Sequence, residues 1–241
     1  MSLDLVDYEK KAKKAVKTFW ETRLNAKEKG KNADKGERSA VTSGKNLDGF
    51  IELMIDIIHA NGLPGTKIML EKKVLTLPGF FRPTKLWDVL AFHKGQLIIA
   101  LEFKSHVGPS FGNNANNRCE EALGTAIDFW TAFKEGSFGD IDRPFVGYLT
   151  VLEDAEKSRL PIMVKEPHYQ VFPAFKDSSY ATRYDILCKR LMDESLYTAA
   201  TMLFSPREAA KNGSFTCISN RSGLKHFISK LAAHVASIAA N

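Results

Sequence analysis

The chain has 241 residues and a net charge of +6; 44% of the residues are hydrophobic and 26% are charged. These values exclude wholesale disorder and a fibrous repeat, and no apolar run is long enough to cross a bilayer. The first residues do not resemble a signal peptide, and the three cysteines are an odd number without CxxC spacing. We therefore expect a cytoplasmic protein without a disulfide framework or a structural zinc site.

Charge is unevenly distributed along the chain. Lys and Arg outnumber Asp and Glu by 12 to 7 in residues 1–45 and again by 12 to 7 in residues 155–241, whereas residues 46–154 carry 10 against 14. Basic ends around an acidic middle would suit a protein that grips a polyanion and holds a cation at its centre. An ordinary solvated surface would give the same counts, so charge alone does not decide between these interpretations.

The N-terminal part begins with apolar residues at three- and four-residue spacing, which predicts a helix over residues 4–28. A polar, glycine-punctuated stretch at 30–46 predicts a loop. Asn46 is a plausible N-cap for a second helix, NLDGFIELMIDIIHAN, which Gly62 and Pro64 would end.

The middle of the chain alternates between strand and helix signals. KIMLEKKVLTL, LWDVLAF and QLIIALEF are strand-like runs broken by PGFFRP and HKGQ. An Asn- and Gly-rich loop at 107–117 is expected to precede a helix from Arg118 to Gly136, and PFVGYLTVL is a further strand. The predicted order over residues 46–152 is therefore α-β-β-β-α-β.

The last third is predicted to be mostly helical, with helices over 180–196 and 223–240 around the short strand TAATMLF. We expect a single α/β domain over residues 1–241. Its predicted parts are an N-terminal helix with a basic loop (1–45), a catalytic core (46–152) and a mostly helical C-terminal part (153–241).

The strongest local signal is an ExK motif, formed by Glu102 and Lys104 at the end of QLIIALEF, with Asp88 on the preceding strand. Residues two apart on a strand point to the same face, so Glu102 and Lys104 emerge together. If Phe92 pairs with Leu97 in a regular hairpin, Asp88 faces away from Glu102. A β-bulge would bring the carboxylates together, and we predict this distorted register.

Two carboxylates and a lysine are the groups that a phosphodiester-cutting centre needs. Carboxylates bind a hard cation such as Mg²⁺, which activates water and offsets charge on the phosphate, while a lysine can orient that water. A surface Glu–Lys pair has the same spacing. Charged side chains at the end of the apolar run LIIAL nevertheless favour a functional role.

The predicted element order, with Asp on the second strand and ExK on the third, resembles the PD-(D/E)xK nuclease core. Longer stretches resemble the XhoI family of type II restriction endonucleases, over residues 3 to about 150: FWETR (19–23), GKNLDGF (44–50), RPTKLWDVLAF (82–92), LEFKSHVGPSFGNN (101–114) and NRCEEALGTA (117–126). Trp87 stands where the motif's name has proline, a departure that does not touch the ligands.

The resemblance implies a homodimeric, Mg²⁺-dependent enzyme that cuts both strands of the palindrome CTCGAG after the first C. The products would carry 5′ overhangs and 5′-phosphates, and a cognate DNA methyltransferase would be a functional partner. By position, Asp88, Glu102 and the backbone carbonyl of Phe103 would be metal ligands, and Lys104 would position the water. Asp48 is a further candidate for the metal site, although it could equally complement the dipole of its helix.

Polar residues that could contact DNA follow the motif: Asn113, Asn114, Asn117 and Arg118. Asparagine can pair with adenine and arginine with guanine in the major groove. The asparagines could equally form turns, with Asn117 as the N-cap of the next helix. Ser105 and His106 are expected either to touch phosphate or simply to end the strand.

Two other functions fit the same residues. One is a repair or recombination nuclease on the same core that reads DNA structure, and the other is a DNA-binding protein with an inert ExK motif. For a dimer, the helix carrying Asp48 and the apolar face of the C-terminal helix are the candidate interfaces.

Overall fold

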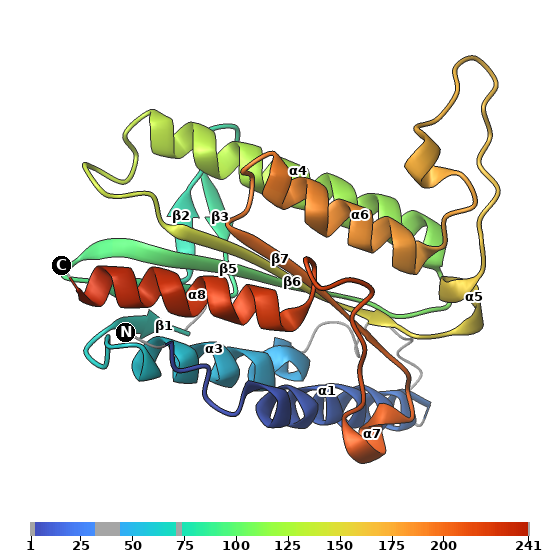
Figure 1. Ribbon diagram of the computed structural model, residues 1–241, viewed down its shortest axis with the longest axis horizontal. Helices are drawn as coiled ribbons and strands as arrows, with labels where there is room; N and C mark the ends of the chain where they lie inside the picture. Colours follow the sequence, from blue (N-terminus) through green and yellow to red (C-terminus); the bar gives the residue numbers. More distant parts are fainter. Residues whose placement is uncertain (1–2, 32–43, 71–73, 241) are drawn as a thin grey trace.

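A mixed five-stranded sheet forms the centre of the protein in the computed structural model, which describes residues 3–31, 44–70 and 74–240 (Figure 1). The strand order is β1-β4-β5-β6-β7; β1, β4 and β5 are antiparallel, while β6 and β7 run parallel to β5. A separate hairpin is formed by β2 and β3. The strands are β1 (Lys67–Met69), β2 (Thr76–Pro78), β3 (Thr84–Leu86), β4 (Val89–His93), β5 (Gln96–His106), β6 (Phe145–Glu153) and β7 (Ala199–Ser205).

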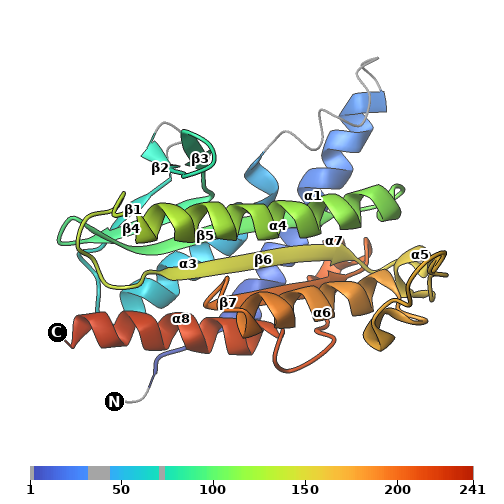
Figure 2. The ribbon, with the colours of Figure 1, turned by 90° about the horizontal axis from the view of Figure 1, so that it is seen from above.

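Helices cover both faces of this sheet, as Figures 1 and 2 show. One face carries α4 (Phe111–Lys134) and α6 (Tyr180–Asp193), and the other carries α1 (Tyr8–Lys31), α3 (Asp48–Ala60) and α8 (Leu224–Ala239). Short turns of helix complete the chain: η1 (Gly44–Leu47), α5 (Glu156–Arg159), η3 (Pro173–Phe175) and α7 (Ala209–Asn212). Among the described residues, no helix has the length and apolarity that a membrane span requires.

The sheet separates two apolar cores, because successive side chains of a strand point to opposite faces. In β5, Ile99, Leu101 and Phe103 pack toward α1, α3 and α8, whereas Ala100 packs toward α4 and α6. Glu102 follows Ala100 on the α4 side and is buried. A buried carboxylate in this position needs compensating partners, which the site provides.

Helices α1 and α3 pack closely where Gly49 meets Ala15. A Cβ atom at Gly49 would lie 2.8 Å from the Ala15 Cα atom, so a larger residue would push the helices apart. Lys11 on α1 forms an ion pair with Asp56 on α3. The acidic side chain of Asp56 therefore serves helix packing at the surface.

Several predictions are confirmed. The chain has the expected α/β class, and helices occur over 180–193 and 224–239 with a strand between them. The elements of the main sheet and its helices follow the order α3-β1-β4-β5-α4-β6, with the β2–β3 hairpin inserted between β1 and β4, so the predicted core topology stays a prediction. Most of the expected loop at 30–46 lies outside the described residues.

Three predictions are wrong in detail. KIMLEKKVLTL and LWDVLAF each divide into two strands, so that β2 and β3 form a hairpin outside the main sheet. Helix α4 begins at Phe111, not at Arg118, so the expected loop at 107–117 is largely helical and Asn117 is not an N-cap. The apolar face of α8 is buried against the sheet, so it is not available as a dimer interface.

Candidate active site

A β-bulge in the β4–β5 hairpin sets the position of Asp88. Phe92 pairs with Leu97, but the register then shifts so that Val89 pairs with Leu101. Asp88 directly precedes Val89 and donates its backbone N–H to the Leu101 carbonyl oxygen at 3.1 Å. The register shift confirms the predicted distortion of the hairpin, and it places Asp88 beside the end of β5.

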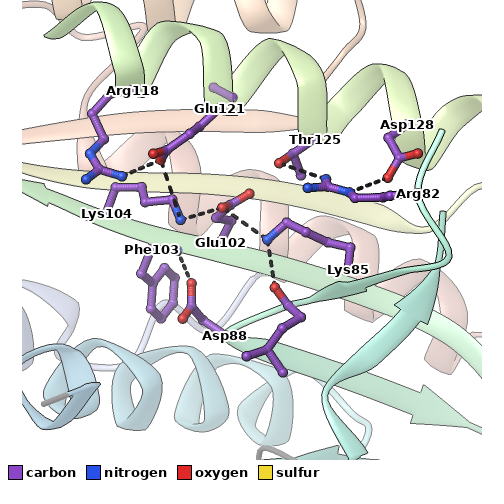
Figure 3. Close-up of polar contacts among 12 residues, drawn as sticks. Arg82, Lys85, Asp88, Glu102, Phe103, Lys104, Arg118, Glu121, Thr125 and Asp128 are labelled. Carbon is purple, nitrogen blue, oxygen red and sulfur yellow. Dashed lines mark hydrogen bonds and ion pairs between the residues drawn. The ribbon is translucent and has the colours of Figure 1, made fainter. Parts of the chain in front are cut away.

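Glu102 lies at the centre of the site and is almost fully buried, with a side chain that is 2% exposed. Its Oε1 atom accepts from two ammonium groups, Lys104 Nζ at 2.6 Å and Lys85 Nζ at 3.2 Å (Figure 3). Its Oε2 atom is buried and has no hydrogen-bond partner among the described residues. Burial alone would raise the pKa of Glu102, but the two lysines hold it below its ordinary value.

Asp88 is held by the edge of β5. Its Oδ2 atom accepts a hydrogen bond from the backbone N–H of Phe103 at 2.7 Å, beyond the point where β4 stops pairing. Burial raises the pKa of Asp88 above its ordinary value; the Phe103 N–H and the charge of Lys104 oppose this shift, and the charge of Glu102 adds to it. Asp88 therefore lies within the electrostatic influence of both Lys104 and Glu102.

Lys104 lies on β5 and also reaches a carboxylate on α4. Besides Glu102, its ammonium group lies 3.9 Å from a carboxylate oxygen of Glu121, which also pairs with Arg118 (Figure 3). The charged groups thus form a chain that runs from Arg118 across α4 to Glu102 and on to Lys85. In this chain each carboxylate faces at least one cation.

The β2–β3 hairpin carries Lys85 into the site, and Asp128 on α4 fixes the tip of that hairpin. Both Phe80 and Phe81 donate backbone N–H groups to Asp128 Oδ1 at 2.8 Å, and Arg82 donates to Oδ2 at 2.7 Å. A Cβ atom at Gly79 would lie 2.4 Å from the Asp128 carboxylate, so the tip can approach this closely only with glycine there.

The residues expected to contact DNA are placed differently from one another. Asn113 and Asn117 are exposed on the first turns of α4 and Asn114 is half-buried, so all three lie on a helix instead of a loop. The Arg118 guanidinium is already paired with Glu121, and its Nε atom is buried without a partner among the described residues.

Ser105 and His106 end strand β5, but their surroundings differ. Ser105 is half-buried and accepts a hydrogen bond from Arg23 of α1 at 2.9 Å. His106 is 1% exposed; its Nδ1 atom lies 2.9 Å from the Tyr184 hydroxyl, and burial lowers its pKa to about 4. His106 is therefore a core residue whose ring contacts Tyr184, and Ser105 is bonded to α1; a phosphate contact by either side chain stays a prediction.

The donor set fits a hard divalent cation only in part. Among the described residues, no group of three or more His, Cys, Asp and Glu side chains could hold a metal ion. Asp88 and Glu102 are a pair of oxygen donors, and the unpartnered Oε2 of Glu102 is the kind of atom that a cation would satisfy. Asp48 is the exposed first residue of α3.

Comparisons with known proteins give the chain a family. The restriction endonuclease XhoI family matches residues 25–217. The chain is 50% identical over 194 residues to the type II restriction enzyme XhoI of Xanthomonas vasicola, covering 80% of this chain and 78% of the relative. It is 42% identical over 222 residues to the type II restriction enzyme BstVI of Geobacillus stearothermophilus, covering 90% and 98%. The chain belongs to the XhoI restriction endonuclease family.

This membership extends the similarity further than the sequence motifs suggested. The match reaches residue 217 and so includes β7, whereas the motif stretches ended near residue 150. The type II restriction enzyme AbrI of Azospirillum brasilense is 53% identical over 173 residues, covering 70% of this chain and 78% of the relative. The names of these relatives are those of site-specific deoxyribonucleases. No solved structure matches the chain at a significant level.

Sequence analysis missed three residues of this XhoI-family site: Lys85, Glu121 and Arg23. Lys85 stands three residues before Asp88 in the stretch RPTKLWD, so its position was visible although its direction was not. Glu121 is three residues after Arg118 in the helix that the sequence predicts, a spacing that brings the two side chains together, but no pattern places Glu121 beside Lys104. No signal in the sequence places Arg23 beside Ser105.

Proposed function

We propose that this XhoI-family protein is a type II restriction endonuclease that hydrolyses both strands of duplex DNA at a palindromic site. One observation carries the proposal: the buried Glu102 carboxylate has an unsatisfied oxygen and pairs with Lys104, next to the point where Asp88 accepts the Phe103 N–H. Burial of such a group is costly, so its retention indicates chemistry at this point of the fold. The family similarity supports the same activity.

Mg²⁺ is the proposed cofactor, with Asp88, Glu102 and the Phe103 carbonyl oxygen as its protein ligands and Asp48 as a further candidate. Since a residue's N–H and C=O point the same way in an antiparallel pair, the Phe103 carbonyl faces the side from which Asp88 accepts the Phe103 N–H. When bound, Mg²⁺ would supply Lewis acidity to the phosphate and lower the pKa of a coordinated water.

The protein's own groups have separate roles in the proposed reaction. Lys104, held between Glu102 and Glu121, orients the attacking water and stabilises the negative charge that develops on the phosphate. Glu102 remains ionised because two lysines surround it. Water attacks phosphorus in line, and the products are a 3′-hydroxyl and a 5′-phosphate.

DNA recognition is proposed for the start of α4 and the end of β5. Asn113, Asn114 and Asn117 would face the major groove, Arg118 would exchange its pair with Glu121 for a base or a phosphate, and Ser105 would contact the backbone. We further propose that α3-β1-β4-β5-α4-β6 is a PD-(D/E)xK core, which the element order supports.

The proposed enzyme is a homodimer, because a chain with one cutting centre needs a second copy to cut both strands across a DNA dyad. The proposed site is CTCGAG, cut after the first C, with a DNA methyltransferase as the functional partner that protects the host site. Digestion of DNA of known sequence in Mg²⁺, with the ends mapped, tests activity, site and overhang together. Intact ordinary duplex would contradict the proposal.

Sedimentation at working concentration tests the dimer, together with the order of products from supercoiled plasmid. Concerted cutting by a species of about twice the chain mass of 26.9 kDa is expected. A monomer that accumulates stable nicked circles would contradict the dimer without contradicting the nuclease.

A further inference from the structure

Lys85 is a second ammonium group at Glu102, and it comes from outside the main sheet. Its Nζ atom lies 3.2 Å from Glu102 Oε1 and also donates to the Leu86 carbonyl oxygen at 2.7 Å (Figure 3). The ammonium lies over the ring of Trp87, 5.2 Å from its centroid. With a side chain that is 14% exposed, Lys85 is poorly hydrated and depends on these partners.

The hairpin that carries Lys85 is fixed at its far end as well. Asp128 anchors the tip through Arg82 and through the backbone of Phe80 and Phe81, and Asp128 is buried on α4. Lys85 is therefore held at Glu102 by a braced element. A flexible surface lysine that happened to meet a carboxylate would have no such support.

The two lysines at Glu102 are not equivalent. Lys104 has a second carboxylate, Glu121 at 3.9 Å, to which it can turn if Glu102 is engaged elsewhere. Among the described residues, Lys85 has Glu102 as its only carboxylate partner within ion-pair distance. Both lysines share Oε1, so a divalent cation at Oε2 of the same carboxylate would lie close to two ammonium groups and be repelled by them.

We propose that Lys85 is a positioning residue that competes with the divalent cation for Glu102. This inference rests on the proposed function, in which Glu102 is a metal ligand. With no cation present, Lys85 balances the buried carboxylate and keeps it oriented. The same contact lowers the affinity of the site for a cation, because the Lys85 ammonium at Oε1 repels a cation that binds at the neighbouring Oε2.

The test is the affinity of the DNA-free protein for Mn²⁺, measured from the free Mn²⁺ signal in electron paramagnetic resonance. Lys85→Met keeps the aliphatic length and removes the charge, so Mn²⁺ should bind at least about tenfold more tightly than to wild type. Lys85→Arg keeps the charge and should stay near wild type. Lys225→Met removes an exposed charge from α8, on the opposite face of the sheet, and should also stay near wild type.

A purely structural role for Lys85 predicts the opposite result, because a Glu102 that loses its support should bind Mn²⁺ more weakly. Unchanged or weaker binding by folded Lys85→Met therefore overturns the proposal, as does equal tightening in Lys225→Met. If Lys85→Met does not fold, loosening in the Lys85→Gln variant would overturn it and tightening would support it. Glu102→Gln tests the proposed metal site separately. If Glu102→Gln binds Mn²⁺ as tightly as wild type, the metal site is refuted. If Glu102→Gln loses Mn²⁺ binding while the Lys85 variants bind as wild type does, only the competition is refuted.

Discussion

At Asp88 the effect of the charge can be measured separately from the effect on the fold, because the neutral isostere asparagine can keep the same hydrogen bond. In the folded protein, Asp88 Oδ2 accepts the Phe103 N–H at 2.7 Å. Asparagine has the same shape and retains a side-chain oxygen for that N–H, but it has no charge to offer a cation. Asp88→Asn should therefore remove cleavage and leave the fold intact.

The expected magnitudes follow from the surroundings of the carboxylate. The folded-state pKa of Asp88 is raised, so the ionised form costs stability at any pH above that pKa, and Asp88→Asn removes this cost. We expect the Asn variant to lie within about 0.5 kcal/mol of wild type, or above it. Asp88→Ala leaves the Phe103 N–H without its acceptor, which should cost about 1–3 kcal/mol.

Both variants should lose cleavage by a factor of at least about 10³, because a catalytic cation contributes several kcal/mol to transition-state stability. Specific DNA binding should persist or tighten, since a negative charge near the phosphate is gone. Urea unfolding gives the stability difference, and single-turnover cleavage with gel-shift titration gives the other two quantities. Near wild-type cutting by Asp88→Asn in Mg²⁺ would refute the metal assignment, and equal destabilisation by Asn and Ala would refute the hydrogen-bond argument.

Four further changes probe other parts of the molecule. Glu102→Ala should abolish cutting while specific binding stays intact or tightens, which plasmid digestion and gel shifts measure; residual cutting near the wild-type rate would contradict its role. Asp128→Ala removes the anchor of Arg82 and of two backbone N–H groups, so urea unfolding should show a loss of about 2 kcal/mol, against no loss for the exposed Asp142→Ala. The pKa of His106 is about 4 in the folded protein and about 6.5 in the unfolded chain, so the free energy of unfolding falls as the pH falls from about 6.5 to about 4. In His106→Gln this pH-dependent loss should be smaller by up to about 3 kcal/mol. Neutralising the lysines in residues 27–45 should weaken binding to all sequences alike and reduce its salt dependence; an altered sequence preference with an unchanged salt slope would contradict this.

Local patterns predicted most helices and the strands of the main sheet, but they could not show where a strand changes its partner. Between β3 and β4 the chain leaves one pairing for another: Trp87 donates its N–H to Leu75, and Asp88 donates to Leu101. Both halves of LWDVLAF are extended and apolar, so they look like one strand in the sequence. The two halves become separate strands only because each pairs with a different neighbouring strand.

The start of α4 shows how packing can override composition. Asparagine-rich segments favour turns, which is why a loop was expected at 107–117. The helix instead begins at Phe111, whose buried ring lies 5.0 Å from the His106 ring and 5.8 Å from the Tyr180 ring. Burial of that ring fixes the first turn, and Tyr180 comes from a helix remote in sequence.

The ExK pair and its aspartate were predictable because they depend on one strand and one hairpin. The partners from other elements were not. Lys85 meets Glu102 only because the hairpin is anchored on α4, and Glu121 meets Lys104 only because α4 crosses β5 at that point. Spacing within a single element carries no information about such contacts.

The bulge in the β4–β5 hairpin results from two constraints that a regular hairpin cannot satisfy together. Lys94 and Gly95 both have positive φ, 48° and 82°, as a two-residue type I′ turn requires, and this turn fixes Phe92 opposite Leu97. Farther along, Val89 and Leu101 pair and pack into the same core, which demands a register shifted by one residue.

Ile98 absorbs the difference between the two registers. It has no pairing partner on β4, yet it is only 7% exposed because it joins the core on the α8 side next to Ile99. The unbroken apolar run LIIAL permits this: every residue in it can face either core, so an extra residue exposes nothing and buries no charge. The first position at which the face matters is Glu102, next to the Phe103 N–H that Asp88 accepts. The apolar run LIIAL therefore permits the bulge in the hairpin that carries Asp88 and Glu102 in this nuclease family member.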